Sequence, residues 1–215
     1  MNTYMREPIN GLTHLAGALL SFVALIAMVI KSSMTTGSPL SIAAVIIFGI
    51  SMILLYSASA TYHMVIAKDK VIAFLRRLDH SMIFVLIAGT YTPFCLISLK
   101  GVTGWVLFSI VTAIAIFGVI FKLVWFHCPR WLSTALYIAM GWMIIFFASP
   151  LSDQLNSNGL FLLILGGILY TIGGVIYGAK PKFLKSKYMG YHEIFHIFIM
   201  LGTLAHFFSV FLYVI

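Results

Sequence analysis

The sequence predicts an all-α integral membrane protein, in which residues 1–215 form a single domain of seven transmembrane helices. Three observations support this fold class: the mean hydropathy is +1.09, 62% of the 215 residues are hydrophobic and only 8% are charged. Soluble domains carry roughly 25% charged residues and leave about a third of their surface exposed at this length. A water-soluble fold could not hide so much apolar surface, which excludes soluble enzymes, secreted disulfide scaffolds and disordered segments.

Seven apolar runs divide the chain. Each is about 19 to 25 residues long, the length that a helix needs to cross roughly 30 Å of hydrocarbon. A β-barrel would instead show alternating patterns in blocks of about ten residues. The connections are short, so we expect no separate soluble domain. In chain order, the predicted spans are Gly11–Ile30, Leu40–Tyr62, His80–Leu99, Gly104–Trp125, Trp131–Ser149, Gly159–Ala179 and Tyr191–Ile215.

Local features add three further expectations. The first is expected to be a retained helix, because it is longer than the apolar core of a signal peptide and lacks a clear cleavage site. In the sixth, the pairs Gly166-Gly167 and Gly173-Gly174 predict close helix packing. Cys95 and Cys128 are placed near opposite membrane faces, so no disulfide is expected between them.

The basic residues predict the orientation of the bundle. Only Lys31 and Lys100 fall on one side of the membrane. The other side holds Arg6, Lys68, Lys70, Arg76, Arg77, Lys122, Arg130, Lys180, Lys182, Lys185 and Lys187. Because Lys and Arg favour cytoplasmic loops, the N-terminus is predicted to be cytoplasmic and the C-terminus outside. The net charge of +8 is explained by this topology, and no nucleic-acid partner is expected.

Ionisable residues inside the predicted spans are informative because each is costly in hydrocarbon. The chain has seven histidines and five acidic residues. His206 alone is placed deep, toward the outer half of the membrane. The other six lie at cytoplasmic helix ends or in a cytoplasmic loop: His14, His63, His80, His127, His192 and His196.

The sharpest local pattern is His192-Glu193-Ile194-Phe195-His196, at the start of the last span. Two histidines four residues apart share one helix face and can bind one metal ion together. The letters also match the HExxH motif of zinc proteases. However, no acidic residue follows Glu193, and His206 lies ten residues beyond His196, about 15 Å along a helix. A third ligand must therefore come from another helix.

The second span offers that ligand, because His63 is predicted to lie at the same depth as His192 and His196. Three imidazoles with an open fourth position are typical of catalytic rather than structural zinc. Asp79, expected at the start of the third helix, could accept a proton from a water molecule there or hold it in place. Ser59, one turn before His63, could bond that water or a substrate oxygen.

Each of these residues also has a structural explanation. His192 and His196 could be interior histidines bonded to neighbouring helices. Asp79 could cap the third helix, since Asp stabilises a helix N-terminus. Ser59 could satisfy a backbone carbonyl.

Four further residues have open roles. His14 and Glu7 either brace the site or anchor the amino-terminal segment. His80 points about 100° away from Asp79 around the helix and is expected at an interface or behind the site. His206 is expected to be a hydrogen-bonded interior histidine.

Motifs along almost the whole chain resemble the bacterial hemolysin III family, within the wider progestin and adipoQ receptor family. They are Glu7-Pro8-Ile9-Asn10, Thr13-His14, Ser59 to His63, Leu78 to Ser81, Gly89 to Pro93, Gly141-Trp142, Gly173-Gly174, Tyr177, His192 to His196 and His206. The resemblance implies a seven-helix bundle with a cytoplasmic N-terminus and zinc near the cytoplasmic face. The family's zinc-binding histidines match His63, His192 and His196, and its serine and aspartate near the metal match Ser59 and Asp79.

The same resemblance implies several functions. Its eukaryotic relatives are adiponectin and progestin receptors, and a related superfamily includes alkaline ceramidases, which are zinc-dependent lipid amide hydrolases. The bacterial branch is named for a haemolytic activity. Where the receptors commonly have Gln between the two histidines, this chain has Glu193.

The first functional hypothesis is therefore a multi-pass cell-membrane hydrolase that uses Zn²⁺ to cleave a membrane lipid amide or ester. Alternatives are a non-catalytic sensor or regulator of lipid homeostasis and the cytolytic activity in the family name. A transporter is also conceivable, but the polar groups cluster at one face and no relay crosses the membrane. Lipids are the expected partners. The substrate, turnover, metal identity and oligomeric state stay open.

Overall fold

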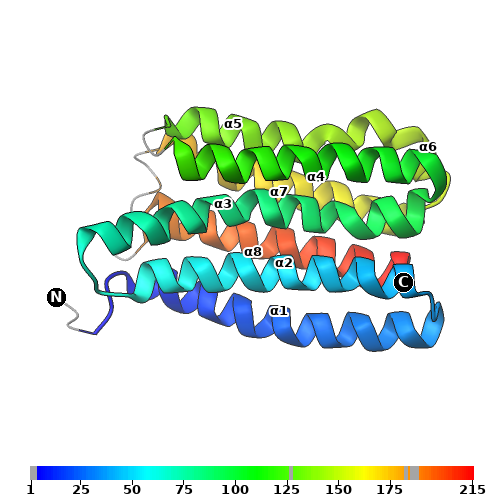
Figure 1. Ribbon diagram of the computed structural model, residues 1–215, viewed down its shortest axis with the longest axis horizontal. Helices are drawn as coiled ribbons and strands as arrows, with labels where there is room; N and C mark the ends of the chain where they lie inside the picture. Colours follow the sequence, from blue (N-terminus) through cyan, green and yellow to red (C-terminus); the bar gives the residue numbers. More distant parts are fainter. Residues whose placement is uncertain (1–3, 126–127, 182–183, 185–188) are drawn as a thin grey trace.

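The computed structural model describes residues 4–125, 128–181, 184 and 189–215, so the predicted loop residues His127, Lys182, Lys185 and Lys187 lie outside the described residues. Within the described part, seven helical segments are long and apolar enough to cross a membrane. The predicted fold class, an all-α membrane bundle, is confirmed. Figure 1 shows these segments running back and forth along one long axis.

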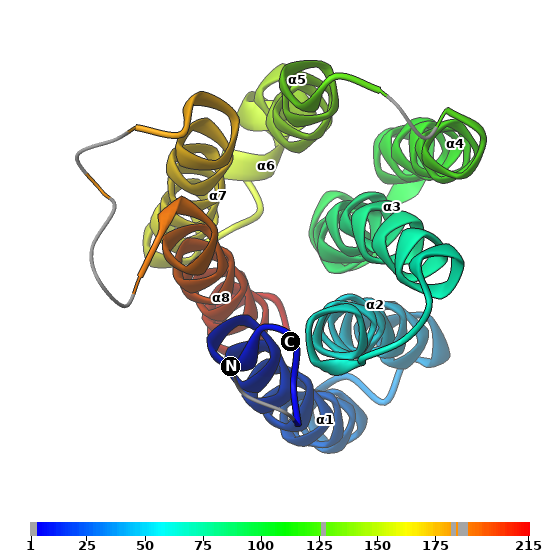
Figure 2. The same cartoon turned by 90° about the vertical axis from the view of Figure 1, so that its left-hand side faces the viewer.

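The helices form a ring when the bundle is viewed along its axis, with α4 packed on the outside of α3 (Figure 2). The last helix, α8, contacts both α7 and α1, which closes the ring. The elements are α1 Pro8–Thr35, α2 Pro39–Met64, α3 Asp69–Pro93 with the π-helix η1 Phe94–Leu99, α4 Gly101–Val124, α5 Arg130–Gly141, the 3₁₀-helix η2 Trp142–Phe147, α6 Ala148–Ser152, α7 Ser157–Ala179, α8 Tyr191–Ser209 and the π-helix η4 Val210–Val214.

Side-chain burial fits a bundle surrounded by lipid. Phe48, Phe84 and Phe94 are almost fully buried between helices, whereas Phe22 and Phe117 are largely exposed on the outer surface. Large apolar side chains on the outside are the expected partners of lipid chains. The polar residues of the interior are therefore the ones that need explanation.

The third span begins much earlier than predicted, which corrects one interpretation. Helix α3 starts at Asp69, so Asp79 lies inside the helix and does not cap it. The segment before Asp79 carries Arg76 and Arg77 and has lower hydropathy, but its apolar residues still favour a helix. Long basic side chains can keep their charges at the membrane surface while the helix continues beyond the hydrocarbon.

The fifth span is not the continuous helix predicted for Trp131–Ser149. It changes from α5 to a 3₁₀ segment after Gly141 and resumes as α6. The hydroxyl of Tyr91, on α3, lies at the break: it contacts the Met140 and Gly141 carbonyls at 3.0 and 2.7 Å and accepts from the Ile144 amide at 2.9 Å. A side chain inserted into the backbone ladder explains the break and supplies partners that lipid cannot.

Close packing of α2 on α3 depends on Gly89. A Cβ atom at this position would overlap Cβ and Oγ of Ser51, which is itself buried. The Oγ atom could rotate away, but the Cβ of Ser51 is fixed by its backbone, so the helices would have to separate. Small residues permit such close helix contacts in membranes.

We expect Gly89→Ala to destabilise the bundle by about 1–3 kcal/mol through overpacking. The midpoint of thermal unfolding in detergent, followed by circular dichroism, measures this effect. Gly141→Ala is the matched control, because an added Cβ there has no neighbour within 4 Å. Equal midpoints for the two variants would contradict the role of Gly89.

Candidate metal centre

Three histidines from two helices converge at one end of the bundle. His63 lies in the last turn of α2, and His192 and His196 lie in the first two turns of α8. One nitrogen from each ring lies within 4.8 Å of the others, so the three could hold a metal ion. His63 and His196 are almost fully buried. The spacing of His192 and His196 in the sequence and the predicted membrane depth of His63 thus both agree with this cluster.

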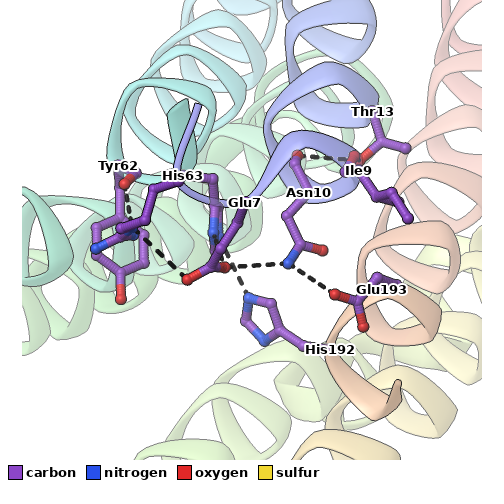
Figure 3. A network of polar contacts seen from close by, with 9 residues as sticks. Glu7, Ile9, Asn10, Thr13, Tyr62, His63, His192 and Glu193 are labelled. Carbon is purple, nitrogen blue, oxygen red and sulfur yellow. Dashed lines mark hydrogen bonds and ion pairs between the residues drawn. The ribbon is translucent and has the colours of Figure 1, made fainter. Parts of the chain in front are cut away.

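Glu7, immediately before α1, fixes the orientation of His63. Its Oε2 lies 2.7 Å from His63 Nδ1, and its backbone amide donates to the His63 carbonyl at 2.9 Å (Figure 3). The hydrogen bond from His63 lowers the pKa of Glu7 to about 2, so the carboxylate is ionised at neutral pH. Because a carboxylate only accepts, Nδ1 carries the proton and Nε2 keeps its lone pair for a metal.

Asn10 and Glu193 link the starts of α1 and α8. Asn10 Nδ2 donates to Glu7 Oε2 at 3.2 Å and to Glu193 Oε1 at 3.0 Å. Glu193 Oε2 accepts from the backbone amide of Gly190 at 2.8 Å and so caps α8. Figure 3 shows Asn10 between the two carboxylates. One Glu193 oxygen therefore joins α8 to α1 and the other caps α8, so both are engaged outside the histidine cluster.

The distance between two of the histidines fits a tetrahedral zinc ion. Two nitrogens that each lie about 2.05 Å from one zinc ion are about 3.3 Å apart. His63 Nε2 and His192 Nε2 are 3.3 Å apart. His196 Nδ1 is buried and has no hydrogen-bond partner among the described residues. An unsatisfied buried nitrogen is costly, so this end of the bundle leaves histidine nitrogens available to a ligand.

Ser59 and Asp79 lie next to this cluster and face the same cavity. The cavity measures about 490 Å³, and its lining includes Ser59, Asp79, His192 and His196. Asp79 is 7% exposed and interacts electrostatically with His63 and Ser59. Ser59 Oγ is buried with no partner at hydrogen-bonding distance among the described residues. Both side chains are thus beside the histidines but are not members of the cluster.

The remaining intramembrane histidines occupy distinct positions. His14, on α1, stacks against His196 with ring centroids 3.6 Å apart and planes 10° from parallel, so it braces the cluster. His80 faces Tyr177 edge-on, with ring centroids 6.4 Å apart, and lines the same cavity. His206 Nε2 lies 3.2 Å from the Leu163 carbonyl deep in the bundle.

The sequence analysis left the role of Glu7 open and did not foresee the link between Asn10 and Glu193. One signal could have found Glu7: it directly precedes Pro8, the first residue of α1. Pro is favoured at the first position of a helix, which places Glu7 at the helix end nearest the histidines. The link from Asn10 to Glu193 on α8 could be found only from knowledge of which helices are neighbours.

A bundle of seven membrane-length helices with a histidine cluster at one end defines a class, the multi-pass membrane proteins with a possible intramembrane metal site. The chain belongs to the haemolysin-III related family, whose model matches residues 2–207. This finding confirms the resemblance seen in the sequence.

Two similar bacterial proteins extend over nearly the whole chain. The chain is 42% identical to Hemolysin-3 of Bacillus cereus over 218 aligned residues, covering 100% of this chain and 95% of the relative. It is 41% identical to a Hemolysin-3 homolog of Bacillus subtilis (strain 168), covering 99% and 96%. A more distant relative is heptahelical transmembrane protein 5 of Arabidopsis thaliana, at 26% identity over 70% of this chain and 44% of the relative.

We expect Glu7→Ala to weaken metal binding by about 10- to 100-fold, because removing a carboxylate that orients a ligating histidine has this effect. Metal retention during dialysis against graded concentrations of a chelator measures the change. The control is Asp69→Ala, which removes an exposed carboxylate at the start of α3. Unchanged retention in Glu7→Ala would show that this contact does not serve the metal.

Proposed function

We propose that this membrane protein is a zinc-dependent hydrolase that cleaves a lipid amide or ester. The observation that carries the proposal is the combination of three converging histidine nitrogens with a cavity that Ser59 and Asp79 also line. Three imidazoles, one of them hydrogen-bonded to a carboxylate, are the ligand set of many catalytic zinc sites. His63, His192 and His196 would hold the ion.

The protein's own groups divide the remaining tasks. A bound metal supplies Lewis-acid polarisation of the substrate carbonyl and lowers the pKa of water. Asp79 would accept the proton of the attacking water and pass it to the leaving group, which is the work of a general base and then a general acid. Ser59 Oγ, which meets no hydrogen-bond partner at normal geometry among the described residues, would donate to the substrate oxygen.

The cavity lining favours a lipid over a water-soluble substrate. Beyond the histidines it continues between the helices along apolar residues that include Leu86, Phe94 and Leu163. Its volume of about 490 Å³ falls in the usual range of small-molecule sites, about 300–1,000 Å³. An amphiphile could place its polar bond near the histidines and its chain among these residues.

Metal content tests the first half of the proposal. We expect about one zinc ion per chain in protein purified without chelator, and its loss in His63→Ala and in His192→Ala. Elemental mass spectrometry measures it. His80→Ala is the matched control, because His80 lines the same cavity outside the cluster, and this variant should retain the metal. Well-folded wild-type protein without any metal would refute the zinc site.

Turnover tests the second half. We expect Asp79→Asn to keep its zinc but to lower hydrolysis of a lipid amide or ester by about 10²- to 10⁴-fold, the usual contribution of a general base. The assay follows fatty acid release from a panel of lipid amides and esters in detergent micelles. Zinc-loaded wild-type protein that cleaves none of them would favour a non-catalytic sensor of lipid state.

A further inference from the structure

A second group of charged residues lines the same cavity at the place where α4 ends and α5 begins. Lys122 lies near the end of α4, Arg130 is the first residue of α5, and Arg76 is on the neighbouring part of α3. All three border the cavity. Lys122 is only 6% exposed, which is unusual for a lysine. We call Arg76, Lys122 and Arg130 the cation cluster.

Among the described residues, no carboxylate forms an ion pair with the cation cluster, although Asp79, which also lines the cavity, interacts electrostatically with Arg76. The ion pairs in the described part of the chain join Glu7 to Arg6 and to His63. Lys122 Nζ donates to Ser133 Oγ at 2.9 Å, a neutral partner. Burying a charge is expensive unless an opposite charge compensates it. Among the described residues, the buried ammonium group thus has one hydrogen bond to a neutral hydroxyl and no ion pair with a carboxylate.

Neighbouring groups make this place more positive. Arg76 and Lys122 are close enough to interact electrostatically, and both also act on His80. Helix α5 begins at Arg130 and presents the partially positive end of its backbone dipole. The hydroxyl groups of Ser133 and Thr134, in its first two turns, border the cavity as additional donors. Such an arrangement is suited to an anion.

We propose that the cation cluster binds the phosphate monoester head group of an anionic lipid whose chain lies in the apolar part of the cavity. A phosphate monoester carries a charge of about −1.5 to −2 near neutral pH, which matches several cations better than a carboxylate does. Arginine bonds phosphate with two parallel N–H groups, and lysine acts as a point charge. The cavity supplies both the charged end and the apolar continuation that such a lipid needs.

The cation cluster lies beside the histidines and is separated from them by one aromatic ring. Arg130 Cζ is 5.8 Å from the centre of the Tyr177 ring, and that ring is 5.5 Å from the His192 ring. A bound head group would therefore hold the polar end of the lipid at the same end of the cavity as the metal centre. Binding at this place does not depend on turnover, but if the proposed hydrolysis is correct, its substrate is an anionic lipid.

Equilibrium binding of phosphatidic acid to purified, metal-loaded protein in detergent, measured by native mass spectrometry, tests this inference. We expect one molecule per chain and an affinity that falls about tenfold or more in Lys122→Gln and in Arg130→Gln, because each loses a charged hydrogen bond. Lys70→Gln removes an exposed lysine at the same end of the bundle, and its affinity should stay within about twofold of wild type.

Other ligands and measurements distinguish the alternatives. Diacylglycerol with the same chains should bind at least about tenfold more weakly, since it lacks the charge. Equal affinity for diacylglycerol would overturn the inference by showing that binding is apolar. A loss of affinity in Lys70→Gln as large as in Lys122→Gln would overturn it by showing general charge attraction. Inorganic phosphate that binds as tightly as the lipid would overturn the lipid assignment. Zinc content and unfolding midpoint, both expected to match wild type, separate these outcomes from loss of the metal centre or of the fold. Arg130, which is partly exposed, provides the test if Lys122→Gln does not fold.

Discussion

The contact between Glu7 and His63 joins parts of the chain that are far apart in sequence, and the arrangement of the histidine cluster depends on it. It attaches the start of α1 to the end of α2 through one side-chain bond and one backbone bond. Through Asn10 and Glu193 the same network reaches the start of α8. The three histidines come from α2 and α8 alone, so α1 acts as the connection that holds both helices in register.

A second polar layer lies deeper and serves the same purpose. Thr203 Oγ1, on α8, is 2.6 Å from the hydroxyl of Tyr56 on α2 and 2.8 Å from that of Tyr170 on α7. The Tyr56 ring also meets His14 edge-on at 5.1 Å. In a bilayer, buried polar groups must find partners within the protein. These hydrogen bonds therefore join α2, α7 and α8, and the ring contact of His14 adds α1 to the same layer.

Much of this arrangement could be predicted from the sequence, because it depends on the hydropathy of each segment and on residue spacing within single helices. Hydropathy identifies each span independently, and the four-residue spacing of His192 and His196 predicts that they share one helix face. The position of His63 beside them followed from membrane depth, since a span fixes where its ends lie. Asp79 and Ser59 were placed near the histidines by the same argument.

The remaining features depend on contacts between helices and carry no comparable signal. The early start of α3 was missed because its first turns combine charged and apolar residues. The mean hydropathy of such a segment is low, so it does not stand out as part of a span. The break after Gly141 is caused by the hydroxyl of Tyr91, about 50 residues earlier in the chain. The partner of Lys122 is likewise on another helix. Such features become visible only once the neighbours of each helix are known.

The position of Glu7 has a practical consequence for protein production. The start of α1 lies at the same end of the bundle as the histidine cluster, whereas the carboxyl end lies at the opposite end (Figure 1). A polyhistidine tag fused before Met1 would bring extra imidazoles within a few residues of Glu7 and compete for the same ion. Purification through a tag after Ile215 leaves the metal stoichiometry interpretable.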